Sequence, residues 1–216
     1  MASFLAACFD LDGTLIDTES IHISAESECL ATFGVNIEDS HRPRTFGLGI
    51  ELGMQSLADV FKLDFASVLN MYLPLWEKGL QSALRMLPGS NEVLSWLVNH
   101  EVPLALVTSG DAAYVDLIDS VVGLKQAFSV TITSDSISRL KPDPMAYLEA
   151  AKKFGVDPGA CIGFEDSGAG ITALNSAGMF SVAVHPEHES RSELHTAKLR
   201  VKAMDAVQPQ LSSWFG

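Results

Sequence analysis

The sequence has few cysteines, few basic residues and no long apolar run. Only Cys8, Cys29 and Cys161 are cysteines among its 216 residues, and no two of them form a Cys-x-x-Cys pair. This number excludes a disulfide framework and predicts buried, reduced thiols in a cytoplasmic protein. The N-terminus lacks the basic start and long apolar stretch of a secretory signal, and no run has the length of a transmembrane helix. We therefore expect no membrane partner.

Positive charge is also scarce. The chain has 14 lysine and arginine residues against 27 aspartate and glutamate residues, a formal net charge of −13, and it has no basic run. Such an acidic chain is a poor partner for the phosphate backbone of nucleic acids, so we expect no nucleic-acid binding. No heptad pattern for a helical interface stands out, and a monomer is expected. The length and the 47% content of hydrophobic residues allow a full core plus a small insert.

Short apolar runs alternate with helical patterns along most of the chain. This alternation predicts a Rossmann-like three-layer α/β core, in which helices cover both faces of a parallel sheet. Residues 17–85 interrupt it, because they contain helical patterns and no convincing strand. We therefore expect a core formed by residues 1–16 and 86–216, with a small helical cap domain inserted at 17–85. The expected strands are 4–9, 104–108, 128–133, 161–165 and 180–184, and the expected helices outside the insert are 90–99, 111–120, 144–154 and 168–176.

Two acidic residues stand at the end of the first expected strand. Asp10 and Asp12 are two residues apart, which in an extended chain places both carboxylates on one side, roughly 7 Å apart. Buried carboxylates are costly unless something binds them, and a hard cation such as Mg²⁺ would offset that cost with its preference for oxygen ligands. Gly13 then lets the chain leave the strand sharply. On this stretch alone, a plain Asp-Gly turn is the alternative interpretation.

Polar residues also follow three further strands of the expected sheet. Thr108 and Ser109 follow the second strand, Lys141 follows the third, and Glu165 and Asp166 end the fourth. Ligands bind at the carboxyl ends of the strands in open parallel sheets. Taken singly, Thr108 could cap a helix, Lys141 could be a solvated loop cation and the two acids could complement a helix dipole. Their recurrence at consecutive strand ends favours one common site.

Four ordered motifs make the chain resemble the haloacid dehalogenase superfamily of phosphohydrolases. The resemblance is greatest to its beta-phosphoglucomutase-like and small sugar-phosphatase branch, and only about residues 190–216 carry little of it. The motifs are Asp-x-Asp-Gly-Thr-Leu at residues 10–15, Thr108 after Leu106-Val107, Leu140-Lys141-Pro142-Asp143-Pro144, and the acidic motif over residues 163–171, which continues to Ala177-Gly178-Met179.

The resemblance implies catalytic roles for the matched residues. Asp10 would be the nucleophile that forms an aspartyl-phosphate, and Asp12 would be the general acid and base. Lys141 would neutralise phosphate charge. Thr108, with Ser109 beside it and with backbone N–H groups at a helix start, would bind the phosphate oxygens.

The resemblance also implies a Mg²⁺ site. Asp10 and Asp166 would bind the ion through their side chains, and Asp12 would bind it through its backbone carbonyl. Glu165 would help to hold the metal and its waters. Mg²⁺ would then share with the catalytic lysine the neutralisation of phosphate charge.

Individual residues of the motifs indicate which of the superfamily's reactions the chain is expected to catalyse. Asp12 and Asp166 argue against a dehalogenase, and Asp12 also argues against phosphonate cleavage. The mutases have a cap arginine where Ile50 stands here, and Thr14 is more like the simple phosphatases. A phosphomutase is therefore disfavoured, although it stays the nearest alternative.

Several other polar residues have two interpretations each. His22 lies where the mutase has a cap-hinge histidine linked to the acid-base aspartate, and a solvated helix histidine is equally consistent with its position. Arg42 and Arg44 could meet an anionic substrate, but a solvated pair is the simpler interpretation. His185-x-x-His188 could border the site, although its spacing alone is weak evidence for zinc and a loop is more common.

The sequence therefore predicts Mg²⁺-dependent hydrolysis of a small phosphorylated metabolite, with a sugar phosphate as the best candidate because this branch often handles them. The cap would close over the site and select the substrate. A binding or regulatory module that retains the fold is an alternative, but the intact motifs do not favour it. A dinucleotide-dependent oxidoreductase would need a glycine-rich loop where Asp-Leu-Asp-Gly-Thr stands, and no strand precedes Gly47-x-Gly49.

Overall fold

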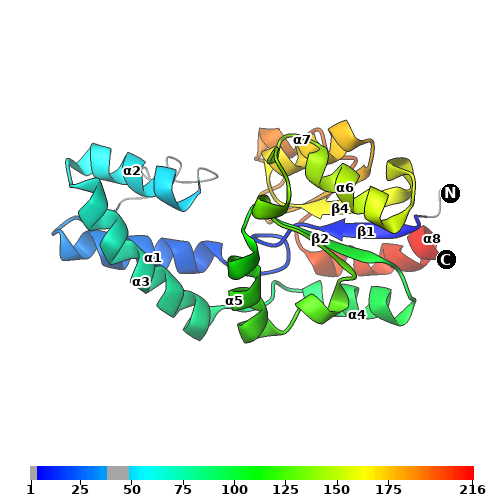
Figure 1. The fold of residues 1–216 in the computed structure, drawn as a ribbon, viewed down its shortest axis with the longest axis horizontal. Coiled ribbons are helices and arrows are strands. Elements are labelled where there is room, and N and C mark those ends of the chain that lie inside the picture. The colour runs from blue at the N-terminus through cyan, green and yellow to red at the C-terminus, as the bar shows by residue number, and fades with distance from the viewer. Residues whose placement is uncertain (1–3, 38–48) are drawn as a thin grey trace. The chain divides into compact units, whose positions relative to one another are not determined.

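The chain forms two compact units. The structure, a computed structural model, describes residues 4–37 and 49–216 (Figure 1), so that Arg42, Arg44 and Gly47 lie outside the described residues. Residues up to Asp17 together with Arg85–Gly216 form the first unit, and Thr18–Leu84 form the second. In the described ranges, no helix combines the length and the apolar character that crossing a membrane requires. The role of the second unit as a cap stays a prediction.

A parallel sheet lies at the centre of the first unit. Its six strands within the described residues are β1 (Ala6–Phe9), β2 (Leu104–Val107), β3 (Val130–Ile132), β4 (Cys161–Glu165), β5 (Phe180–Val184) and β6 (Leu199–Val201). Neighbouring strands all pair in parallel, in the order β3-β2-β1-β4-β5-β6. The order changes direction between β1 and β4, and ligands bind at the carboxyl ends of strands at such a switch point. The predicted fold class is confirmed.

Helices cover both faces of this sheet. The helices of the first unit are α4 (Ser90–Asn99), α5 (Ala112–Val122), α6 (Met145–Phe154), α7 (Gly168–Ala177) and α8 (Leu211–Phe215). Figure 1 shows α6 and α7 on one face and α4 and α8 on the other. Alternation along β4 explains how both faces are packed. Gly163 faces α7, where a Cβ would lie 2.1 Å from Leu174, and the ring of Phe164 contacts Trp214 of α8 at 6.4 Å between centroids.

The second unit is helical in its described part, as predicted. It contains α1 (Glu19–Thr32), α2 (Ile50–Phe61) and α3 (Phe65–Ala83). Asp64 caps α3 by accepting a hydrogen bond from the backbone N–H of Ser67 at 2.8 Å. Gly79 on α3 leaves room for Ile21 on α1, because a Cβ at this glycine would lie 2.4 Å from the Ile21 side chain. This close approach brings the two longest described helices of the unit together.

The three cysteines are buried and free, which agrees with the prediction of reduced thiols. All five predicted strands are present, although β1, β2 and β3 are shorter than expected. After Val184 the sequence has no pattern from which we predict an element, and the structure adds β6 and α8 there.

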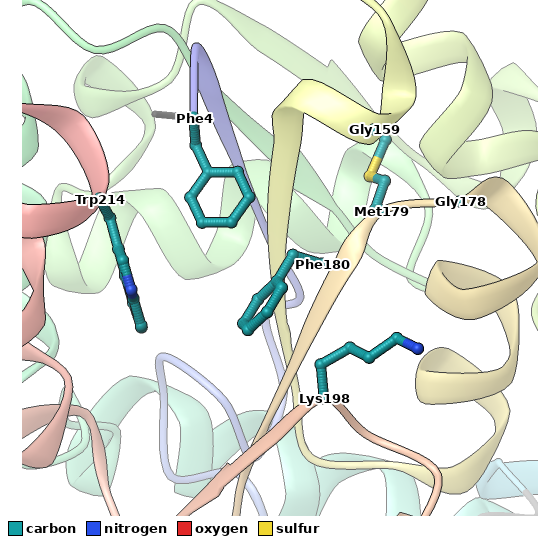
Figure 2. A pocket seen from close by; sticks show the side chains of 7 residues that line it. All are labelled: Phe4, Gly159, Gly178, Met179, Phe180, Lys198 and Trp214. Carbon is teal, nitrogen blue, oxygen red and sulfur yellow. The ribbon is translucent and has the colours of Figure 1, made fainter. Parts of the chain in front are cut away.

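An apolar hollow lies at the amino ends of the strands (Figure 2). Its volume is about 440 Å³. Phe4 precedes β1, Phe180 begins β5, Lys198 precedes β6, and Trp214 closes one side. The rings of Phe4 and Phe180 pack at 5.3 Å between centroids. This hollow is therefore lined mainly by apolar side chains, whereas the predicted polar residues lie at the carboxyl ends of the strands.

Candidate active site

Asp10 is fixed by the main chain at the carboxyl end of β1. Its backbone N–H donates to the carbonyl oxygen of Phe164 at 3.0 Å, which continues the ladder between β1 and β4 by one residue. Alternation along β1 places Asp10 on the same face as Cys8, whose side chain packs in the core beneath α6 and α7. The Asp10 residue is 7% exposed. The sheet therefore holds this carboxylate in a nearly buried position beside the residues that end β4.

Lys141 lies between two carboxylates. Its Nζ donates to Oδ1 of Asp10 at 2.6 Å, to Oε1 of Glu165 at 2.7 Å and to the carbonyl oxygen of Val107 at 2.9 Å. These partners use all three donors of the ammonium group. Burial alone would lower the pKa of Lys141, but the two carboxylates outweigh it and the pKa is raised. The site therefore contains a permanent positive charge in contact with the Asp10 carboxylate.

Glu165 is completely buried and accepts hydrogen bonds on both oxygens. Oε1 accepts from Lys141 Nζ and from the hydroxyl of Tyr147 at 2.8 Å. Oε2 accepts from the backbone N–H of Ser167 at 3.2 Å and from its hydroxyl at 2.9 Å. A carboxylate has about four lone-pair sites, so these four donors account for its capacity. Glu165 thus orients Lys141 and the start of α7, and a direct bond to a cation would displace one of these donors.

Three carboxylates lie close enough to share one metal ion. One oxygen each from Asp10, Glu165 and Asp166 lies within 4.8 Å of the others. Burial and Glu165 raise the pKa of Asp166 to about 8, against the opposing charges of Arg191 and Lys141. Burial and Glu165 likewise raise the pKa of Asp10. A divalent cation would stabilise the ionised forms of these groups, and oxygen donors of this kind suit Mg²⁺.

Asp12 accepts a hydrogen bond from α5, the helix that follows the neighbouring strand β2. Its Oδ1 accepts a hydrogen bond from the hydroxyl of Tyr114 on α5, at 2.5 Å. Neither Tyr114 nor Tyr147 is among the site residues that the motifs predict. Both stand near the start of helices that follow the carboxyl edge of the sheet, at α5 and α6. A polar side chain in the first turn of such a helix is the signal that could have indicated them.

Thr108 and Ser109 form the turn between β2 and α5. Thr108 is buried, and its Oγ1 accepts a hydrogen bond from the N–H of Gly110 at 3.0 Å. Its own N–H donates to the carbonyl oxygen of Ile132 at 3.0 Å. Ser109 is exposed. Asp111 rather than Thr108 caps α5, by accepting from the N–H of Tyr114, so the alternative interpretation of Thr108 as a helix cap is wrong.

His22 lies within the second unit and has partners there on both ring nitrogens. Nδ1 lies 2.5 Å from the hydroxyl of Tyr72, and Nε2 lies 2.9 Å from Oε1 of Glu26. Both partners are buried. The interpretation of His22 as a merely solvated histidine is therefore wrong. Its predicted link to the acid-base aspartate stays a prediction.

His185 and His188 follow β5 and are held by their own loop. The N–H of Glu187 donates to Nδ1 of His185 at 3.0 Å, and Nδ1 of His188 lies 3.0 Å from the carbonyl oxygen of His185. Neither histidine belongs to a cluster of three metal-binding side chains in the part of the chain that the structure describes. These contacts favour the loop interpretation over a zinc site.

The chain is similar to known proteins over nearly its whole length. Residues 7–184 match a family model described as haloacid dehalogenase-like hydrolase. The chain is 33% identical over 209 residues to the validoxylamine A 7'-phosphate phosphatase of Streptomyces hygroscopicus subsp. limoneus, with 95% of this chain and 96% of that protein covered. It is 27% identical over 210 residues to hexitol phosphatase B of Escherichia coli O157:H7, with 92% and 90% covered.

A solved structure agrees with these sequence matches. The HAD family hydrolase from Deinococcus radiodurans R1, whose structure has bound phosphate and sodium, superposes with a TM-score of 0.83. The two chains are 26% identical, and the alignment covers 99% of this chain and 97% of that one. The match therefore includes both compact units.

Proposed function

This chain belongs to the haloacid dehalogenase-like hydrolases, and from this premise we propose that it is a Mg²⁺-dependent phosphatase of small sugar phosphates that works through an aspartyl-phosphate on Asp10. The family and its named phosphatases confirm the predicted enzyme class, a phosphoric monoester hydrolase. The observation that carries the finer proposal is the position of Lys141 Nζ, between the Asp10 carboxylate and Glu165 at 2.6 and 2.7 Å.

In this proposal Asp10 attacks the phosphorus of the ester. Burial at the end of β1 limits the motion of its carboxylate, and Lys141 screens it from the approaching phosphate dianion. Thr108 donates its hydroxyl to a phosphate oxygen, since its side chain lies at the carboxyl end of the strand next to β1. When bound, Mg²⁺ would supply positive charge that neutralises the transferring phosphoryl group, held by the side chains of Asp10 and Asp166.

Asp12 acts as the general acid in the first step and as the general base in the second. It gives a proton to the leaving oxygen of the substrate as the aspartyl-phosphate forms, and it then takes a proton from the water that hydrolyses this intermediate. The sugar-phosphate class is supported by the names of the two relatives, a validoxylamine A 7'-phosphate phosphatase and a hexitol phosphatase. The helical unit would select among such esters as a cap.

The phosphomutase alternative is not favoured by any contact in the described residues. Ile50, which begins α2, stands at the position where the mutases have a cap arginine for the second phosphate of the substrate. A mutase would also release little free phosphate from a sugar phosphate, and this difference can be measured directly.

The test is phosphate release from a panel of hexose, hexitol and pentose phosphates, with Mg²⁺ and with a chelator. We expect Mg²⁺-dependent release that Asp10→Asn abolishes without unfolding the protein. Asp116→Asn is the matched control, because Asp116 lies on the exposed surface of α5 and pairs with Lys125. Retained activity in Asp10→Asn would overturn the proposed nucleophile. Isomerisation of a sugar phosphate with little phosphate release would establish the mutase instead.

A further inference from the structure

Tyr114 contacts Asp12 from a position 102 residues further along the chain. The hydroxyl of Tyr114 donates to Oδ1 of Asp12 at 2.5 Å, and both residues belong to the first compact unit. A hydrogen bond to an ionised carboxylate is among the stronger kinds in proteins. The contact therefore joins the residue proposed as general acid and base to the start of α5, directly after the turn that follows β2.

The local structure of this turn is adapted to the tyrosine. Gly110 has no side chain, and a Cβ there would lie 2.4 Å from Cδ1 of Tyr114, so the ring occupies the space that any other residue would fill. Asp111 accepts a hydrogen bond from the N–H of Tyr114 at 2.8 Å, which fixes the first turn of α5. Thr108 accepts from the N–H of Gly110 at 3.0 Å. One short segment thus carries both the predicted phosphate ligand and the tyrosine.

We propose that Tyr114 is a positioning residue for Asp12 and decides which of its two carboxylate oxygens exchanges the catalytic proton. The proposal rests on the proposed function of Asp12 as general acid and base. It assigns Tyr114 no direct contact with the substrate. Its effect is confined to the orientation of one carboxyl group.

The direction of the hydrogen bond determines the choice of oxygen. Because Oδ1 of Asp12 accepts the proton of the Tyr114 hydroxyl, the transferable proton of the neutral carboxylic acid is on Oδ2. As the bond from Asp10 to phosphorus forms and the bond from phosphorus to the leaving oxygen breaks, that oxygen takes the proton from Oδ2. As water then adds to phosphorus and the bond to Asp10 breaks, Oδ2 takes a proton from the water. The tyrosine keeps its own proton in both steps.

Leaving groups of different basicity test this proposal. An alkyl phosphate such as a hexitol phosphate needs a proton on its leaving oxygen, whereas p-nitrophenolate leaves from p-nitrophenyl phosphate without one. The ratio kcat/KM reports the steps up to departure of the leaving group, so it isolates the acid step from the later hydrolysis. In Tyr114→Phe we expect kcat/KM to fall about tenfold or more for the alkyl ester, within the range of general acid catalysis, and clearly less for the aryl ester.

Two further variants show whether the tyrosine acts through Asp12. In Asp12→Asn the proton donor is absent, so adding Tyr114→Phe should cause little further loss for the alkyl ester. Ser120→Ala is the matched control, because it also removes one hydroxyl from α5 and that hydroxyl donates only to the carbonyl oxygen of Leu117 in the same helix. Equal losses for both esters in Tyr114→Phe, or additive losses in the double variant, would overturn the proposal.

A structural measurement separates this proposal from the proposed function. Crystal structures of the wild-type protein and of Tyr114→Phe should show Asp12 in one side-chain conformation in the first and in another or in several in the second. An unchanged Asp12 conformation would overturn the positioning role, whether or not the esters are cleaved. If the wild-type protein cleaves no ester while the Asp12 side chain depends on Tyr114, the proposed function alone fails.

Discussion

Gly13 and Asp166 approach each other so closely that no side chain fits between them. A Cβ at Gly13 would lie 2.2 Å from Oδ2 of Asp166. The backbone of Gly13 also has a φ of +74°, in the left-handed region that disfavours other residues. The glycine that follows the two aspartates thus has two separate structural requirements. One is the turn, and the other is room for a carboxylate that we propose as a metal ligand.

Gly13→Ala should therefore lose activity as well as stability. The left-handed backbone costs a residue with a Cβ about 1–2 kcal/mol. Displacement of the Asp166 carboxylate by the new methyl group should lower phosphate release about 100-fold or more, because a misplacement of about 1 Å has effects of this size. Thermal unfolding and phosphate release measured on the same preparation would separate the two losses.

Gly155→Ala is the matched control for this substitution. Gly155 directly follows the last residue of α6 with a φ of +69°, and a Cβ there would meet nothing within 4 Å. We expect a similar loss of stability and no specific loss of activity. Equal activity in the two variants would show that the approach to Asp166 has no functional importance.

The raised pKa of Asp166 predicts a pH dependence of stability that Mg²⁺ should suppress. Burial raises the pKa of this carboxyl from 3.8 to about 8, so between these values the folded protein binds a proton that the unfolded chain has lost. Stability is then fully present below the lower value and is lost as the pH rises through the upper one. In a chelator, the melting temperature should fall from about pH 5 to about pH 8, and the stabilisation by added Mg²⁺ should grow over the same interval.

Asp166→Asn tests the origin of this dependence, because asparagine does not titrate. In the chelator the melting temperature of this variant should fall less steeply with pH than that of the wild-type protein. Groups that do not interact with Asp166 affect both proteins alike and cancel in the comparison. Identical slopes would assign the pH dependence to other groups, such as the buried carboxyl of Asp10, whose pKa is raised for similar reasons.

Local sequence patterns predict the central sheet, because a strand that is buried on both faces is a nearly continuous apolar run in the sequence. The run at Cys161–Glu165 is apolar until its last residue, and it forms β4 as expected. β6 has no such run, because it is three residues long and has Arg200 at its centre. Its position depends on pairing with β5. A pattern read along the chain cannot show such an edge strand, since the partner strand supplies most of its stability.

The candidate site is predictable to the extent that strand order brings residues together. Asp10 and Lys141 follow strands and Glu165 ends one, and the fold places their side chains in contact. Tyr114 contacts Asp12 although the two are 102 residues apart in the sequence, and His22 contacts Tyr72 although these two are 50 residues apart. These contacts depend on the rotation of helices about their axes. Neither composition nor spacing determines that rotation, which explains why neither contact is predicted from the sequence.

Lys141→Met should strongly destabilise the protein. The substitution removes the cation that contacts the buried carboxylates of Asp10 and Glu165. Removal of one partner of a buried ion pair costs about 3–5 kcal/mol, because the remaining charge has lost its compensation. Denaturation with urea in a chelator would measure this loss. Lys152→Met is the control, because Lys152 is 76% exposed in its pair with Glu149, and it should change stability by no more than about 0.5 kcal/mol.

Lys141→Arg separates charge from geometry at the same position. The guanidinium keeps the positive charge, but its planar donors cannot reproduce the three directions of the ammonium group toward Asp10, Glu165 and the Val107 carbonyl. We expect this variant to retain more of the stability than Lys141→Met and still to lose most of the phosphate release. Full activity in Lys141→Arg would show that charge alone is sufficient at this position.

His22→Phe should reduce the stability of the helical unit and leave turnover nearly unchanged. The substitution removes the ring nitrogens that contact Glu26 and Tyr72, both of which are buried. Leaving buried polar groups without a partner costs about 1–3 kcal/mol. His100→Phe is the control, since His100 is exposed and directly follows α4. Thermal unfolding should show the loss, while kcat well below the transition should stay within about twofold, a change of less than about 0.5 kcal/mol. A large fall in kcat with unchanged stability would instead support the predicted link between His22 and the acid-base aspartate.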